Sequence, residues 1–197
     1  QKYLSTLLKK DAHRSDTHPT AAELPRPAYH EPGQVITTLA TGGGRHGDRR
    51  AEVLGIAITD EAGRPLEELR APARIVVRVS VRAIERIELP IVGFLMRTEQ
   101  GVDLAGTNTT REDVVLPPLE PGQTVTVDFV VRLPELAPAR YTFTPGIADG
   151  TLLEFRLCDL VEGAASIRIL AGPDPVFGYV HIPCVAVASP AAPRAAT

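Results

Sequence analysis

Two segments of the chain alternate strictly between apolar and other residues, and this period of two constrains the fold more than any other feature. Between residues 75 and 82, every odd-numbered position is Ile or Val, and the even-numbered positions include Arg and Ser. Between residues 124 and 133, the odd positions are Val, Phe or Leu, and the even ones include Thr, Asp and Arg. Successive side chains of a β-strand point to opposite faces, so both segments are predicted to be strands with one buried and one wet face.

Further strands are predicted from weaker patterns, and turn residues lie between them. The segment 90–96 is apolar at every position, which predicts a central strand or one whose outer face is covered. Eight or nine strands at this spacing predict an all-β, immunoglobulin-like antiparallel sandwich. The weaker strands are expected at 52–59, 140–144, 152–158, 166–170 and 176–182, and the turns at 61–63, 99–101, 120–122 and 149–150.

Length and charge limit the classes of protein to which the chain can belong. With 197 residues it is long enough for one sizeable domain. A net charge of −3 makes it a poor candidate for a nucleic-acid-binding protein. It contains no apolar run of the roughly 18 residues that a membrane span requires. Two cysteines are too few for a disulfide framework, and they are expected to be either two reduced thiols or one pair.

The chain is predicted to have three parts. Residues 1–45 are expected to be a helix end, with an apolar stripe formed by Tyr3, Leu4, Leu7 and Leu8, followed by a polar linker from an upstream domain. Residues 46–183 are predicted to form the sandwich, and residues 184–197 a disordered, Ala- and Pro-rich tail. A Pro-Asp-Pro break at 173–175 precedes the last predicted strand, which can pair with its own sheet or be exchanged with a second copy.

The common signatures of catalysis and cofactor binding are absent from the sequence. It has no Gly-x-x-x-x-Gly-Lys-Ser/Thr loop for ATP, no Gly-x-Ser-x-Gly nucleophile turn and no His-Glu-x-x-His zinc motif. Four of the five histidines fall within the first 46 residues and do not form a metal-ligand pattern. We therefore predict no metal and no cofactor. A glycosidase would need two facing carboxylates, and the sequence does not single out such a pair.

One stretch resembles a family signature. Val92-Gly93-Phe94-Leu95-Met96-Arg97-Thr98 leads through a glycine turn to a returning Gly106-Thr107-Asn108 segment. This pair of strands resembles the C-terminal domain of the ATP-binding subunit of Wzt-type bacterial polysaccharide ABC exporters. The segments 47–53, 119–122 and 177–180 agree with the same family, and the likeness covers about residues 45–183. One departure is that the chain contains no Trp.

The resemblance implies a function and a set of partners. It implies a non-catalytic domain that binds the O-antigen or related surface polysaccharide to be exported, with the ATPase in an upstream domain outside this chain. It also implies a homodimer, often formed by exchange of the last strand. The ATPase domain would connect the domain to the membrane subunit of the transporter, on the cytoplasmic side of the inner membrane.

Six residues are the candidate carbohydrate-binding site. Arg97, Asp103, Thr107 and Asn108 flank one strand–turn–strand unit, which is either a sugar-facing polar patch or a hairpin held by its own side-chain bonds. Tyr141 and Tyr179 are candidates for stacking on a sugar ring, and packing in the core or at a dimer seam is the other possibility for both.

Two rival functions remain open at this stage. The first is a ligand-free dimerisation or regulatory module of the transporter ATPase, which predicts buried aromatic residues and a featureless outer face. The second is a carbohydrate-active enzyme with a sandwich fold, which predicts a cleft that holds two carboxylates, one with a raised pKa.

Overall fold

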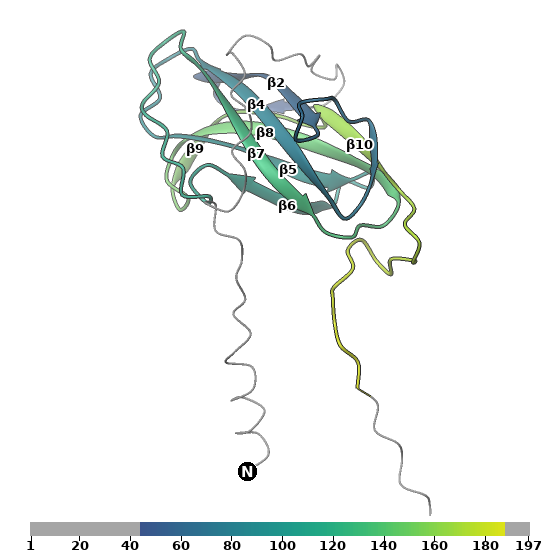
Figure 1. Ribbon diagram of the computed structural model, residues 1–197. Helices are drawn as coiled ribbons and strands as arrows, with labels where there is room; N and C mark the ends of the chain where they lie inside the picture. Colours follow the sequence, from purple (N-terminus) through teal and green to yellow (C-terminus); the bar gives the residue numbers. More distant parts are fainter. Residues whose placement is uncertain (1–43, 188–197) are drawn as a thin grey trace, which may run out of the picture.

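All regular structure in the described part of the chain is β-strand. A computed structural model describes residues 44–187 as a sandwich of two sheets (Figure 1). This confirms the predicted all-β sandwich, with eight longer strands and two short ones. The strands are β1 (Arg45–His46), β2 (Ala51–Thr59), β3 (Glu68–Arg70), β4 (Ala73–Ala83), β5 (Pro90–Thr98), β6 (Asp103–Asn108), β7 (Thr124–Leu133), β8 (Ala139–Gly150), β9 (Phe155–Val161) and β10 (Ala165–Leu170).

The larger sheet is organised around β8, its longest strand. One edge of β8 pairs along most of its length with β5, which in turn pairs with β6. The other edge pairs first with β10 and then with β9, so these two strands lie one after the other beside β8. The short strands β1 and β3 pair alongside β9 and β10, respectively. Among the described strands, only the β10–β3 pair is parallel.

The smaller sheet has the order β2-β4-β7 and is antiparallel throughout. Its central strand β4 contains the first alternating segment, and its edge strand β7 contains the second. The alternation is explained by the packing, because Ile75, Val77, Val79 and Val81 are fully buried between the sheets. Arg78 and Asp128, on the other face, form a two-pronged ion pair across β4 and β7.

The core lies between the two sheets and is aliphatic, with a small aromatic centre. Phe94 of β5 packs edge-on against Phe129 of β7, with ring centroids 5.4 Å apart, and contacts Phe143 of β8 at 5.8 Å. These contacts join the sheets across the middle of the sandwich. Tyr141 and Phe143 are among the largest fully buried side chains.

Several local predictions can be compared with the structure. The segment apolar on both faces is β5, and it is indeed central, between β6 and β8. Glycines at 63, 101, 122 and 150 have positive φ in the predicted turns. The predicted strand at 176–182 does not form. Its residues make one isolated bridge, between Val180 and Leu136, and the chain then extends away from the body (Figure 1).

Two further predictions concern the ends of the chain and its cysteines. The predicted helix end at Tyr3 to Leu8 and most of the predicted linker lie outside the described residues, as does the tail beyond residue 187. Cys158 is buried and Cys184 exposed, and both are free thiols. Between residues 44 and 187 there is no helix long and apolar enough to cross a membrane.

Candidate functional site

The outer face of the larger sheet carries a shallow apolar groove of about 380 Å³. The outward-facing residues of β5, β6, β8 and β9 form it, so the groove crosses four adjacent strands. Aliphatic side chains make most of its walls, and Ile91 and Leu95 are the outward residues of β5 that contribute to them. The lining includes Ile91, Leu95, Ala148, Leu152, Leu157 and Leu160, with Thr107, Asn108, Arg111 and Thr144 as its polar members.

Three glycines form the floor of the groove, where neighbouring strands approach too closely for a side chain. A Cβ at Gly93 would lie 2.5 Å from the carbonyl oxygen of Thr107 on β6. A Cβ at Gly106 would lie 2.6 Å from Leu95 Cδ2, and one at Gly146 would lie 3.1 Å from Leu160 Cδ1. The glycines of the family-like signature therefore permit the contact between β5 and β6 and keep this face hollow.

The polar groups of the groove gather along β6 and the turn after it. The Thr107 hydroxyl donates to Glu112, and Asn108 Oδ1 accepts the backbone N–H of Arg111 at 2.9 Å. The Asn108 side chain therefore also shapes the turn, as the hairpin interpretation predicts. Its amide nitrogen makes no hydrogen bond to another described residue, so a ligand in the groove can accept one from it.

One rim of the groove carries an aromatic ring. Phe155, the first residue of β9, lines the groove and is 57% exposed. Leu152 lies beside it in the β8–β9 connection and is also partly exposed. An exposed ring can pack against the apolar face of a sugar, and the polar donors lie across the groove, on β6 and the turn after it.

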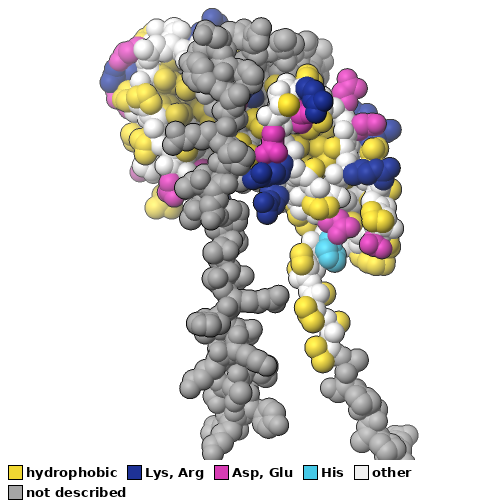
Figure 2. All heavy atoms as spheres, viewed as in Figure 1, with side chains coloured by type: hydrophobic (Ala, Val, Ile, Leu, Met, Phe, Trp, Pro, Cys, Tyr) yellow, Lys and Arg dark blue, Asp and Glu magenta, His cyan; other side chains and the backbone are white. Residues whose placement is uncertain are grey.

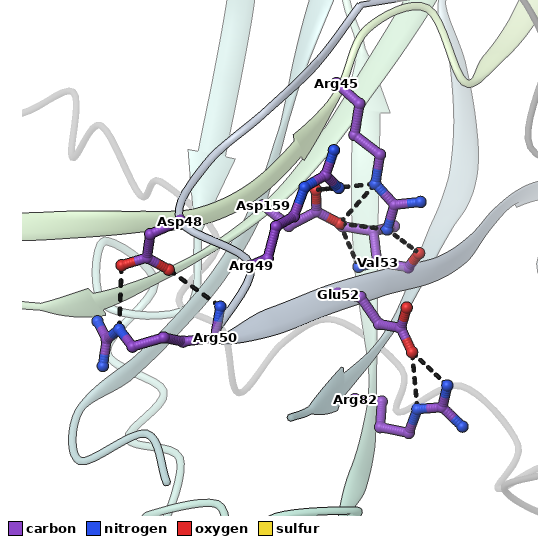
Figure 3. Close-up of polar contacts among 8 residues, drawn as sticks. All are labelled: Arg45, Asp48, Arg49, Arg50, Glu52, Val53, Arg82 and Asp159. Atoms are coloured by element: carbon purple, nitrogen blue, oxygen red, sulfur yellow. Dashed lines mark hydrogen bonds and ion pairs between the residues drawn. The ribbon is translucent and has the colours of Figure 1, made fainter. Parts of the chain in front are cut away.

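A buried ion-pair cluster fixes β9, the strand that forms one wall of the groove. Asp159 is fully buried and accepts hydrogen bonds from Arg45, from Arg49 and from the backbone N–H of Val53, the last at 2.7 Å (Figure 3). Leu160, the next residue along the chain, faces the groove. The basic and acidic segment before β2 is therefore explained structurally, because its arginines neutralise a carboxylate behind the groove wall.

An ion-pair ridge borders the groove at the next outward position of β5. Arg97 donates through Nε to Asp103 on β6 and through Nη1 to Glu162 at 3.2 Å. Because Glu162 follows β9, the bond from Arg97 to Glu162 passes over β8. The hydrogen bond with Asp103 raises the pKa of Arg97, so the guanidinium stays charged.

The structure thus brings four of the six predicted site residues together and separates two. Thr107 and Asn108 line the groove, and Arg97 and Asp103 form its ridge. Tyr141 lies in the core, where its hydroxyl donates to Ala137 O at 2.9 Å, and it does not face the groove. Tyr179 lies in the C-terminal segment, and its carbonyl accepts the N–H of Ala137. Neither tyrosine ring lines the groove.

Sequence reasoning missed Phe155, Leu152, Leu157 and Leu160 as groove residues. The sequence did contain one clue to the groove. Glycines within strands mark places where backbones approach closely, and here three of them occur in strands that also carry outward apolar residues. The register that brings β9 beside Gly146 could not be obtained from one sequence.

The groove lining is mainly apolar and carries few titratable side chains. None of its lining residues, all of which the structure describes, is Asp, Glu, His or Cys. Among residues 44–187, no three such side chains lie close enough together to hold a metal ion. The buried thiol, Cys158, lies on the inner side of β9, and burial raises its pKa to about 11.

Comparisons with known proteins agree with this architecture. The family described as "Wzt C-terminal domain" matches residues 44–182. A solved structure titled "Crystal structure of the C-terminal domain of wzt" superimposes with a TM-score of 0.67 at 16% identity, and the match covers 85% of this chain and 98% of that one. No curated protein sequence matches the chain. Since the family match spans well over half of the chain and includes every strand described above, the chain belongs to the Wzt C-terminal domain family.

Proposed function

We propose that this chain is a non-catalytic carbohydrate-binding domain that recognises the polysaccharide exported by an ABC transporter. The groove on the outer face of the larger sheet is the observation that carries the proposal. It combines an apolar floor, an exposed ring at Phe155 and hydrogen-bonding groups on Asn108 and Arg111. A sugar ring has an apolar face and a rim of hydroxyls, and this groove complements both.

The ligand is an O-antigen or a related surface glycan, and the domain works on the cytoplasmic side of the inner membrane. An ATPase domain upstream of this chain connects it to the membrane subunit. Binding recruits the finished polymer to the transporter and raises its local concentration there. The absence of carboxylates from the groove lining favours this role over the sandwich-enzyme alternative, since a glycosidase requires two of them in one cleft.

Two copies of the domain are proposed to associate through the C-terminal segment. The strands β6 and β7 are both sheet edges, and an apolar hollow of about 350 Å³ opens between them. Val180 of the C-terminal segment lines one side of this hollow, and other described residues of the segment keep hydrophobic side chains exposed, as Figure 2 shows. An exposed apolar segment and an unfilled apolar hollow are what strand exchange between two copies requires.

The groove proposal is tested by Phe155→Ala. Calorimetric titration uses the delipidated surface polysaccharide of the source organism, with an unrelated polysaccharide as the specificity control. We expect affinity to fall about tenfold, which corresponds to about 1.4 kcal/mol, because the exposed ring is lost. Ile84→Ala is the control, since Ile84 is also an exposed hydrophobic residue but does not line the groove.

Either of two results contradicts the proposal. If the folded, unaltered chain does not bind its own polysaccharide, the domain is better explained as a ligand-free dimerisation or regulatory module. If turnover of the glycan accompanies binding, the non-catalytic role is wrong.

A further inference from the structure

We propose that the same sheet face carries a second, polar subsite that binds an uncharged, hydroxyl-rich segment of the polymer, at a distance from the apolar groove. This inference rests on the proposed function and extends it from a single groove to an elongated binding face. The subsite is a hollow of about 400 Å³ at the opposite end of β8. It is lined by Glu67, Glu68, Arg140, Ser166 and Arg168.

The outward residues of β8 connect the two hollows. Every second residue of a strand faces the same side, so Ala148, Gly146, Thr144, Thr142 and Arg140 form one row. Ala148 and Gly146 line the groove, and Arg140 lines the polar hollow. Eight residues at about 3.3 Å each separate the ends of this row, which gives a face about 26 Å long. A polymer lying along β8 would reach both hollows.

The ion-pair ridge divides this face into its two parts. The bond from Arg97 to Glu162 crosses β8 near Thr144, which is fully buried and accepts the N–H of Gly163. A polymer would therefore pass over the charged groups of the ridge between one hollow and the other. These groups offer both donors and acceptors to sugar hydroxyls.

The arginines of the polar hollow are held less firmly than Arg78 of the smaller sheet. Arg140 and Arg168 lie directly opposite one another on β8 and β10, where like charges are destabilising. Arg140 donates to Ser166 at 3.2 Å, and its nearest carboxylate, Glu99, is 3.7 Å away. The side chain of Arg168 forms no ion pair or hydrogen bond with another described residue, in contrast to the two-pronged pair of Arg78 and Asp128.

The carboxylates that line the hollow also lack ion-pair partners among the described residues, and their charge indicates which class of ligand the hollow can bind. Within the described residues, neither Glu67 nor Glu68 has an ion-pair partner, although both face the hollow. Two arginines with Glu67, Glu68 and Glu99 give a local charge of 2 − 3 = −1, which does not attract an anion. Unsatisfied donors beside unsatisfied acceptors fit hydroxyl groups, because each hydroxyl both donates and accepts.

The test compares ligand lengths with the double variant Arg140→Gln/Arg168→Gln. Both arginines are exposed, so the fold should tolerate the changes, and thermal unfolding verifies this. The probes are the delipidated polysaccharide of the source organism and its single-repeat oligosaccharide, prepared by partial acid hydrolysis. Arg82→Gln, on β4 of the other sheet, is the control, because Arg82 is exposed and lines none of the hollows described above.

We expect the double variant to lose about tenfold in affinity for the long polymer and to keep its affinity for the single repeat, which occupies only the groove. We also expect the affinity of the unaltered chain for the polymer to be insensitive to salt. Equal losses in the double variant and in Arg82→Gln would overturn the second subsite, and so would an undiminished affinity of the double variant for the long polymer. A steep salt dependence that disappears in the double variant would overturn the uncharged class. If the unaltered chain binds neither probe, the proposed function itself fails, and the subsite with it.

Discussion

At the scale of single residues, the most consequential side chain is the buried carboxylate of Asp159. Three hydrogen-bond donors, two of them guanidinium groups, compensate for its removal from water (Figure 3). Asp159→Asn removes the charge and leaves the partly buried Arg45 without its partner. Breaking one side of such a pair costs about 3–5 kcal/mol. We expect a loss of that size in the free energy of urea-induced unfolding.

A matched control comes from the neighbouring pair of Glu52 and Arg82, which is more exposed. Glu52→Gln should cost less than about 1 kcal/mol, because solvent screens surface ion pairs. If both substitutions cost the same, the Asp159 cluster does not hold β9 in place, and the support that we infer for the groove wall is wrong.

The acidic residues also predict how stability depends on pH. Burial raises the pKa of Asp149, but hydrogen bonds from the Leu89 N–H and from Arg50 outweigh it and leave the pKa below its ordinary value of 3.8. A lowered pKa in the folded state stabilises the fold above pH 3.8, and this stabilisation is lost as pH falls through the folded-state pKa. The free energy of unfolding should therefore decrease below pH 3.8. Asp149→Asn should reduce that slope, and an unchanged slope would contradict the assignment.

At the scale of strands, alternation predicted the small sheet well because one face of β4 and β7 packs into the core and the other carries most of their polar side chains, although Val76 and Ser80 on that outer face are also buried. The sequence pattern predicted only residues 140–144 of β8, because Pro145 and Gly146 are typical of the end of a strand. The strand continues because Pro145 lies between the residues paired with β10 and those paired with β9. Proline has no backbone N–H, and at this position its absence breaks no hydrogen bond to β9 or β10. The groove depends on this same long strand, so a single sequence could not predict its full lining.

The seam between β5 and β6 gives a prediction about the glycine signature. Gly93→Ala would place a Cβ 2.5 Å from a backbone carbonyl, which cannot move without shifting β6. We expect a loss of about 1–3 kcal/mol in unfolding free energy, in line with overpacked sites. Gly172→Ala is the control, since its Cβ would meet only ordinary contacts. It should change stability by less than about 0.5 kcal/mol. If both substitutions reduce the unfolding free energy equally, β5 and β6 can move apart to accept a side chain, and close packing does not explain the glycine at position 93.

At the scale of the whole molecule, the two apolar hollows open in different directions. The groove and the ridge lie on the outer face of the larger sheet, whereas the hollow between β6 and β7 opens at the side of the sandwich. The two hollows share Gly106 and Thr107 of β6, so a second copy seated in the side hollow would lie beside the groove. Two grooves on one dimer would bind a repetitive polymer with higher avidity than either would alone.

The proposed dimer can be tested without shortening the chain. The double variant Phe177→Asp/Ile182→Asp places charges on two exposed hydrophobic residues of the C-terminal segment. If this segment fills the hollow of a second copy, burying those charges is unfavourable, and sedimentation should change from dimer to monomer. Leu153→Asp is the control, because Leu153 is equally exposed but lies in the β8–β9 connection. It should leave the dimer intact. A monomeric unaltered chain, or a dimer that only Leu153→Asp dissociates, would exclude association through the C-terminal segment.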